Sequence, residues 1–91
     1  MSLPDNVVQQ LQKLIQDNVN KYFGPLKPAE KTPDKVSAYA QKQLDFFISG
    51  IARESKDLQM KWAKGHPYHT RLRMAPGGRF EIEIMEDDGS A

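Results

Sequence analysis

The sequence predicts a small α+β fold in which two amphipathic helices precede a C-terminal β-hairpin. Over the first two thirds of the chain, apolar residues recur every three or four positions, the period of a helix with one buried face. Over the last third they alternate with polar residues, the period of a strand. Pro76-Gly77-Gly78 separates the two alternating runs as a turn would. Ninety-one residues form a single domain, residues 1–91.

The first helix is expected over about residues 6–23, and Gly24-Pro25 ends it. Its apolar stripe consists of Val7, Val8, Leu11, Leu14, Ile15, Val19 and Tyr22. Its polar face carries uncharged amides instead of lysines, which argues against a membrane surface. These amides are Gln9, Gln10, Gln12, Gln16, Asn18 and Asn20. Because neutral amides lose water at lower cost than charges, we interpret this face as a protein contact.

The second helix is expected over about residues 33–64, after a linker rich in proline and charge. Thr32-Pro33-Asp34 supplies a threonine cap, a proline in the first turn and an acid near the positive end of the helix dipole. Gly50 is the weak point, since an interior glycine costs roughly 1 kcal/mol relative to alanine. The sequence therefore predicts one long helix with a kink near Gly50 as an open alternative.

The hairpin strands are expected over about residues 68–74 and 79–85. A three-residue loop, residues 76–78, puts the apolar residues of both strands on one face and requires positive φ at its last position, which Gly78 allows. A one-residue slip would turn every apolar side chain to the wrong face. In this register Arg73 faces Glu81 and Arg71 faces Glu83, and we expect these opposite charges to neutralise one another.

A lone hairpin is marginal in water, so its apolar face must be covered. We expect the far half of the second helix, near Leu58 and Trp62, to cover it. Both strands would still present unpaired backbone groups at their outer edges. Pairing with the hairpin of a second copy would close one edge, so the sequence predicts a homodimer. The alternative is a monomer whose charged strand residues protect its edges.

Several classes of chemistry are disfavoured. The chain has no cysteine, which excludes disulfides, thiolate zinc sites and cysteine nucleophiles. It has no glycine-rich phosphate loop and no nucleophile-elbow motif. Its longest apolar run, Phe46-Phe47-Ile48, is too short to span a bilayer, and the N-terminus lacks a secretory signal pattern. We therefore expect no enzyme, no cofactor, no membrane association and a cytoplasmic location.

A metal site is the one motif that could be read into the sequence. His66 and His69 form an H-x-x-H pattern, and a nearby acid of residues 86–88 could complete a site. The intervening proline makes the pair a turn instead of one helix face. We interpret the histidines as polar residues at the junction between helix and strand, and expect no metal.

Charge is unevenly distributed along the chain. Residues 53–79 carry seven Lys or Arg and two acids, whereas residues 80–91 carry five acids and no base. The basic block could contact nucleic acid, with Trp62 and Tyr68 as stacking surfaces. Residues 86–91 are expected to form a flexible acidic tail.

The function expected is a non-catalytic protein-binding module of regulatory, adaptor or inhibitor type, acting on an unidentified protein through the hairpin edge and a helix surface. The alternative is a small nucleic-acid-binding or transcription-associated protein that uses the basic end of the second helix. Small proteins of this kind are frequent among phage and mobile-element accessory proteins. The candidate partner-binding residues are Arg53, Lys56, Lys61, Lys64, Tyr68, Arg71, Arg73 and Arg79.

Overall fold

The computed structural model describes residues 3–87 and confirms the α+β class, with long helices followed by a two-stranded antiparallel hairpin. The elements in chain order are α1 (Asp5–Phe23), a 3-10 turn η1 (Pro28–Glu30), α2 (Pro33–Arg53), α3 (Lys56–Lys61), β1 (Tyr68–Met74) and β2 (Phe80–Glu86). Glu86, which was expected to begin a flexible acidic tail, belongs to β2. Residues 88–91 of that expected tail lie outside the described part.

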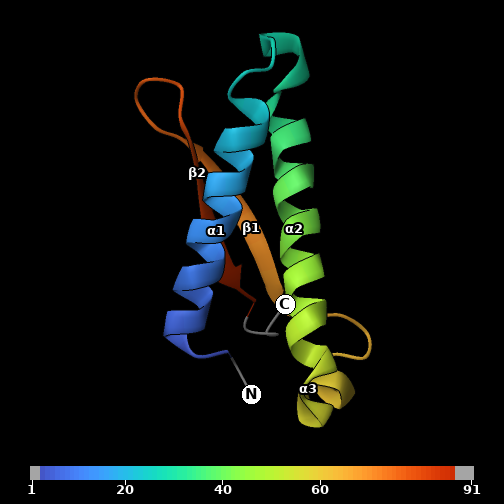
Figure 1. The fold of residues 1–91 in the computed structure, drawn as a ribbon. Helices are drawn as coiled ribbons and strands as arrows, with labels where there is room; N and C mark the ends of the chain where they lie inside the picture. The colour runs from blue at the N-terminus through green and yellow to red at the C-terminus, as the bar shows by residue number, and fades with distance from the viewer. Residues whose placement is uncertain (1–2, 88–91) are drawn as a thin grey trace.

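Two layers make up the fold. The helices α1 and α2 lie side by side and antiparallel, and the hairpin packs on one face of the pair, with β2 along α1 and β1 along α2 (Figure 1). The core lies between the layers and is built from Ile15, Val19, Val36, Ala40, Leu44, Ile48, Phe80, Ile82 and Ile84, with further residues around it. The helix pair therefore covers the apolar face of the hairpin. The prediction that the region of Leu58 and Trp62 would do so is wrong, since α1 packs along β2 and α2 along β1, and the ring of Trp62 contacts Tyr68 at the start of β1.

The expected single helix over residues 33–64 is interrupted. Helix α2 passes through Gly50 and ends at Arg53, and the short helix α3 starts afresh at Lys56. Between them Ser55 is extended, at φ −127° and ψ 115°, and its hydroxyl accepts the N–H of Leu58 at 3.3 Å. A serine in this role caps a new helix and competes with continuation of the old one. The break therefore falls at Ser55 and not at Gly50.

The hairpin has the predicted register, with Met74 opposite Phe80 and Arg71 opposite Glu83. The N–H of Ala75 donates to the carbonyl of Arg79 at 2.8 Å, which closes the three-residue loop. Gly77 and Gly78 have φ values of 90° and 81°, a region that side chains disfavour. The second strand starts at Phe80, one residue later than expected.

Candidate functional site

The outer edge of β2 is closed by amide side chains of α1. Three amides spaced four residues apart accept hydrogen bonds from outward-facing N–H groups of alternate β2 residues. The donors and acceptors are Phe80 N–H to Asn20 Oδ1 at 2.9 Å, Ile82 N–H to Gln16 Oε1 at 3.0 Å, and Ile84 N–H to Gln12 Oε1 at 3.0 Å. Four residues of helix rise about 6.0 Å and two residues of strand about 6.6 Å, so the two repeats stay in step over this length.

This ladder corrects two predictions. The amide-rich face of α1 was interpreted as a surface for a partner, but much of it bonds to the backbone of β2 or, through Asn18, to Gln43 of α2 at 3.0 Å. Both strands were expected to have open edges, yet the edge of β2 is occupied by these side chains. The amides left exposed without such bonds within residues 3–87 are Gln9 and Gln10.

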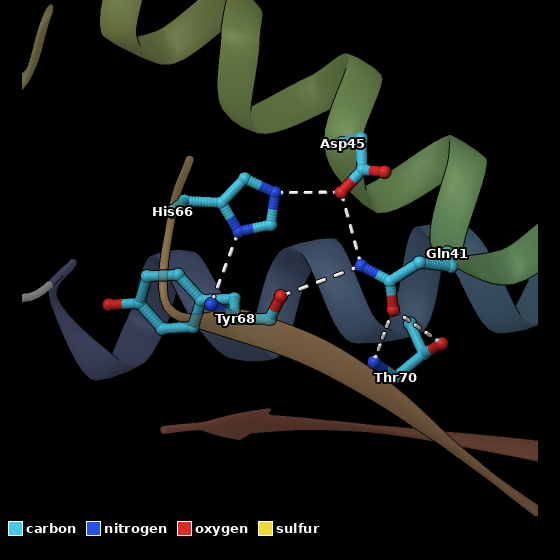
Figure 2. A network of polar contacts seen from close by, with 5 residues as sticks. All are labelled: Gln41, Asp45, His66, Tyr68 and Thr70. Atoms are coloured by element: carbon cyan, nitrogen blue, oxygen red, sulfur yellow. Dashed lines mark hydrogen bonds and ion pairs between the residues drawn. The ribbon is translucent and has the colours of Figure 1, made fainter. Parts of the chain in front are cut away.

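The base of the β1 edge is closed by a polar network from α2 (Figure 2). Gln41 Oε1 accepts the N–H of Thr70 at 2.9 Å and the Thr70 hydroxyl at 3.2 Å. The amide nitrogen of Gln41 donates to Asp45 Oδ1 at 3.1 Å, and at 3.5 Å it also points to the carbonyl of Tyr68. His66 completes the network, with Nε2 2.7 Å from the same Asp45 oxygen and Nδ1 accepting the N–H of Tyr68 at 3.1 Å.

These contacts give His66 a positioning role. Because Nδ1 accepts a hydrogen bond, the ring proton of the neutral imidazole is assigned to Nε2, which donates it to Asp45. Both ring nitrogens are therefore engaged in hydrogen bonds with the chain itself. His69 lies apart, exposed on the outer face of β1, and residues 3–87 contain no group of three or more His, Cys, Asp or Glu side chains placed to hold a metal ion.

The upper half of the β1 edge is open. In an antiparallel pair, residues whose N–H groups point outward face each other across the strands. Since the N–H groups of Phe80 and Ile82 point outward to α1, those of their opposites, Met74 and Leu72, also point away from the hairpin. Neither of these two N–H groups has a hydrogen-bond partner within the described chain. We call the segment Leu72–Met74 the free edge.

The free edge remains open for two reasons. One helical turn before Gln41, α2 carries Ser37, whose side chain is two carbons shorter. In addition, β1 crosses the helix pair obliquely and moves away from α2 toward the hairpin loop (Figure 1). An amide ladder like that of α1 therefore cannot continue along β1.

Two arginines lie along the free edge on the outer face of the sheet, Arg73 within it and Arg71 just before it. Arg71 and Arg73 are exposed and lie opposite Glu83 and Glu81 in the register. The ion pair found within residues 3–87 joins His66 to Asp45, so neither arginine has a carboxylate within 4.0 Å there. The register therefore places the opposite charges across from one another, as predicted, but within residues 3–87 the arginines and glutamates do not form ion pairs.

Apolar surface is exposed at the end of the free edge, where Met74 is 60% exposed. Separately, an open depression of about 780 Å³ lies along α2, the end of α1 and the linker between them, and within residues 3–87 its wall includes no strand residue.

The eight predicted partner-binding residues do not form one surface. Arg53, Lys56, Lys61 and Lys64 are exposed at the end of α2 and around α3, whereas Arg79 lies at the hairpin loop, toward the opposite end of the molecule (Figure 1). Arg71 and Arg73 lie between these ends, beside the free edge. Tyr68 is 4% exposed, and its hydroxyl accepts the N–H of Leu3 at 2.7 Å, so it is part of the core.

Comparison with known proteins adds no relative. No family model, no curated protein and no solved structure matches the chain. Within residues 3–87, none of the helices combines the length and apolar character needed to cross a membrane.

Proposed function

We propose that the protein is a non-catalytic binding module that takes an extended segment of another protein as a third strand on the free edge. Strand addition uses main-chain hydrogen bonds for affinity and alternate side chains for specificity. The observation that carries this proposal is the unequal treatment of the two edges. Side chains close the edge of β2 and the base of β1, while the N–H groups of Leu72 and Met74 have no hydrogen-bond partner among residues 3–87.

A second copy of this chain is the other strand that could add here, as in the predicted homodimer. Antiparallel pairing of two β1 edges about a two-fold axis at Leu72 or Arg73 would place an arginine of one copy beside an arginine of the other. Like charges at such positions oppose pairing. The charge pattern therefore favours a different protein, and sedimentation at micromolar concentration separates the two cases, a mass near 10.4 kDa excluding the dimer.

Nucleic acid is the competing partner class. The bases around α3 are exposed, but the aromatic side chains expected to stack on bases are not, since Trp62 is 9% and Tyr68 4% exposed. Stacking on exposed aromatic rings supplies much of the binding energy for single strands. The basic end thus keeps its charge but lacks that platform.

A peptide display selection tests the proposal. Random twelve-residue peptides are selected on the protein, and the winners are titrated into labelled protein while its backbone amide signals are followed by NMR. We expect the signals of Leu72 and Met74 to shift most. Selected peptides that shift other residues, or a selection that enriches nothing while a nucleic-acid oligomer binds, would overturn the proposal.

Substitution at Met74 gives a matched control. Met74→Pro removes the outward N–H but no bond between β1 and β2, and proline is tolerated where an edge strand faces solvent. Met74→Ala removes the same exposed side chain and keeps the N–H. We expect the proline variant to bind selected peptides at least about tenfold more weakly than the alanine variant, because it loses a hydrogen bond and places a ring against the incoming strand.

A further inference from the structure

Arg71 and Arg73 indicate which strands the free edge accepts. They alternate with the outward N–H groups of Leu72 and Met74, so they lie on the outer face, directly beside alternate residues of any added strand. Their guanidinium groups have no carboxylate within 4.0 Å in the described chain. We propose that the free edge selects segments carrying two acidic residues separated by one apolar residue, an inference that rests on the proposed function.

An acidic residue of an added strand is attracted by the arginines of β1 and repelled by the glutamates of β2, and its distances from the two strands decide which effect is larger. A residue of an added strand lies about 4.8 Å from the backbone of β1 and about 9.6 Å from that of β2. Acidic residues of the partner would therefore neighbour Arg71 and Arg73 directly and would be separated from Glu81 and Glu83 by a whole strand. At physiological ionic strength charges are screened over about 8 Å, so attraction by the arginines outweighs repulsion by the glutamates.

The hairpin itself provides an example of such a strand. In β2, Phe80 and Ile82 face the core, while Glu81 and Glu83 lie on the outer face, each opposite one of the two arginines. A partner of the same pattern would direct its middle, apolar residue to the inner face, toward α2. On that face Leu72 is half-buried and Met74 is exposed, so the added side chain would extend the apolar surface of these two residues.

Two synthetic peptides test this selectivity. Each has nine residues, one alternating Val and Glu and the other Val and Lys, and their affinities for the protein are measured by calorimetry. We expect the glutamate peptide to bind about tenfold more tightly, since two cross-strand charge pairs change from attraction to repulsion in the lysine peptide. The difference should shrink as salt rises from 0.05 M to 0.5 M.

Charge variants then assign the effect to the arginines. We expect Arg71→Gln with Arg73→Gln to abolish the preference and Arg71→Glu with Arg73→Glu to reverse it. The glutamine pair covers the case in which the glutamate pair weakens the hairpin through repulsion from Glu81 and Glu83. The matched control is Lys56→Glu with Lys61→Glu, which changes net charge by the same amount around α3 and should leave the preference intact.

The outcomes distinguish the two proposals. If both peptides bind equally and both lose affinity in Met74→Pro, the edge binds strands but the acidic selectivity is wrong. If neither these peptides nor those from the display selection depend on the Met74 N–H, strand addition itself is wrong. A preference that the control at Lys56 and Lys61 removes would assign the effect to overall charge and overturn the role of the arginines.

Discussion

Asn20 bonds to both backbone groups of Phe80. Its side-chain oxygen accepts the Phe80 N–H at 2.9 Å, and its side-chain nitrogen donates to the Phe80 carbonyl at 2.8 Å. One helical side chain thus replaces what a neighbouring strand would supply at this residue. This two-sided contact stands at the loop end of the ladder that closes β2.

Replacing Asn20 should weaken the fold more than its partial exposure suggests. Asn20→Leu leaves a donor and an acceptor of Phe80 without partners, and we expect a loss of about 1–3 kcal/mol in the free energy of unfolding. Urea denaturation followed by circular dichroism measures this loss. Gln9→Leu, an exposed amide of the same helix, is the control and should change stability by about 0.5 kcal/mol or less. Equal effects of the two substitutions would mean that the ladder contributes little.

Amide hydrogen exchange should differ between the two edges. We expect the amides of Leu72 and Met74 to exchange faster than those of Ile82 and Ile84, because the first pair face solvent and the second pair donate to glutamines of α1. Exchange monitored by NMR in deuterated buffer resolves the four residues. Similar protection of all four would contradict an open upper edge on β1.

Ser55 should be needed for the start of α3. Ser55→Ala removes the acceptor for the Leu58 N–H, and loss of such a cap costs about 0.5–2 kcal/mol. Thermal unfolding measures the change. Ser49→Ala is a useful comparison, because an exposed serine inside α2 has no capping role and alanine is the better helix former. Destabilisation by Ser49→Ala as large as that by Ser55→Ala would argue against the cap.

His66 and Asp45 should be energetically coupled. Their contact of 2.7 Å joins α2 to the segment that leads into β1. A double-mutant cycle with His66→Ala and Asp45→Ala should give a coupling energy of about 0.5–1 kcal/mol, small because Asp45 is half exposed. Additive effects of the two substitutions would show that the histidine acts through Tyr68 alone.

Patterns within one element predicted structure well, and contacts between elements were harder to predict. The register of the hairpin followed from alternation and from the glycine at residue 78, because a slip of one residue would expose the apolar face. The end of α2 did not follow from its apolar spacing, which continues to Trp62, because the cap at Ser55 interrupts the helix despite that spacing. Serine followed three positions later by an apolar residue is too common a pattern to mark a break.

The free edge was beyond sequence reasoning for a different reason. The amides at residues 12, 16 and 20 carry a visible four-residue spacing, but their role depends on α1 lying beside β2, which no local pattern specifies. The same holds for Gln41, whose contact with Thr70 closes the base of β1. Only once both helices are placed does the remaining gap at Leu72 and Met74 become apparent.

The ladder of Gln12, Gln16 and Asn20 also has an evolutionary consequence. Each rung covers one outward N–H group of β2 and lies at the rim of the sheet, outside the hydrophobic interior. A single codon change at any rung would uncover one more backbone site while the interior stayed the same. The number of backbone groups that this sheet offers for strand pairing can therefore change in steps, with the loss or gain of one glutamine or asparagine at a time.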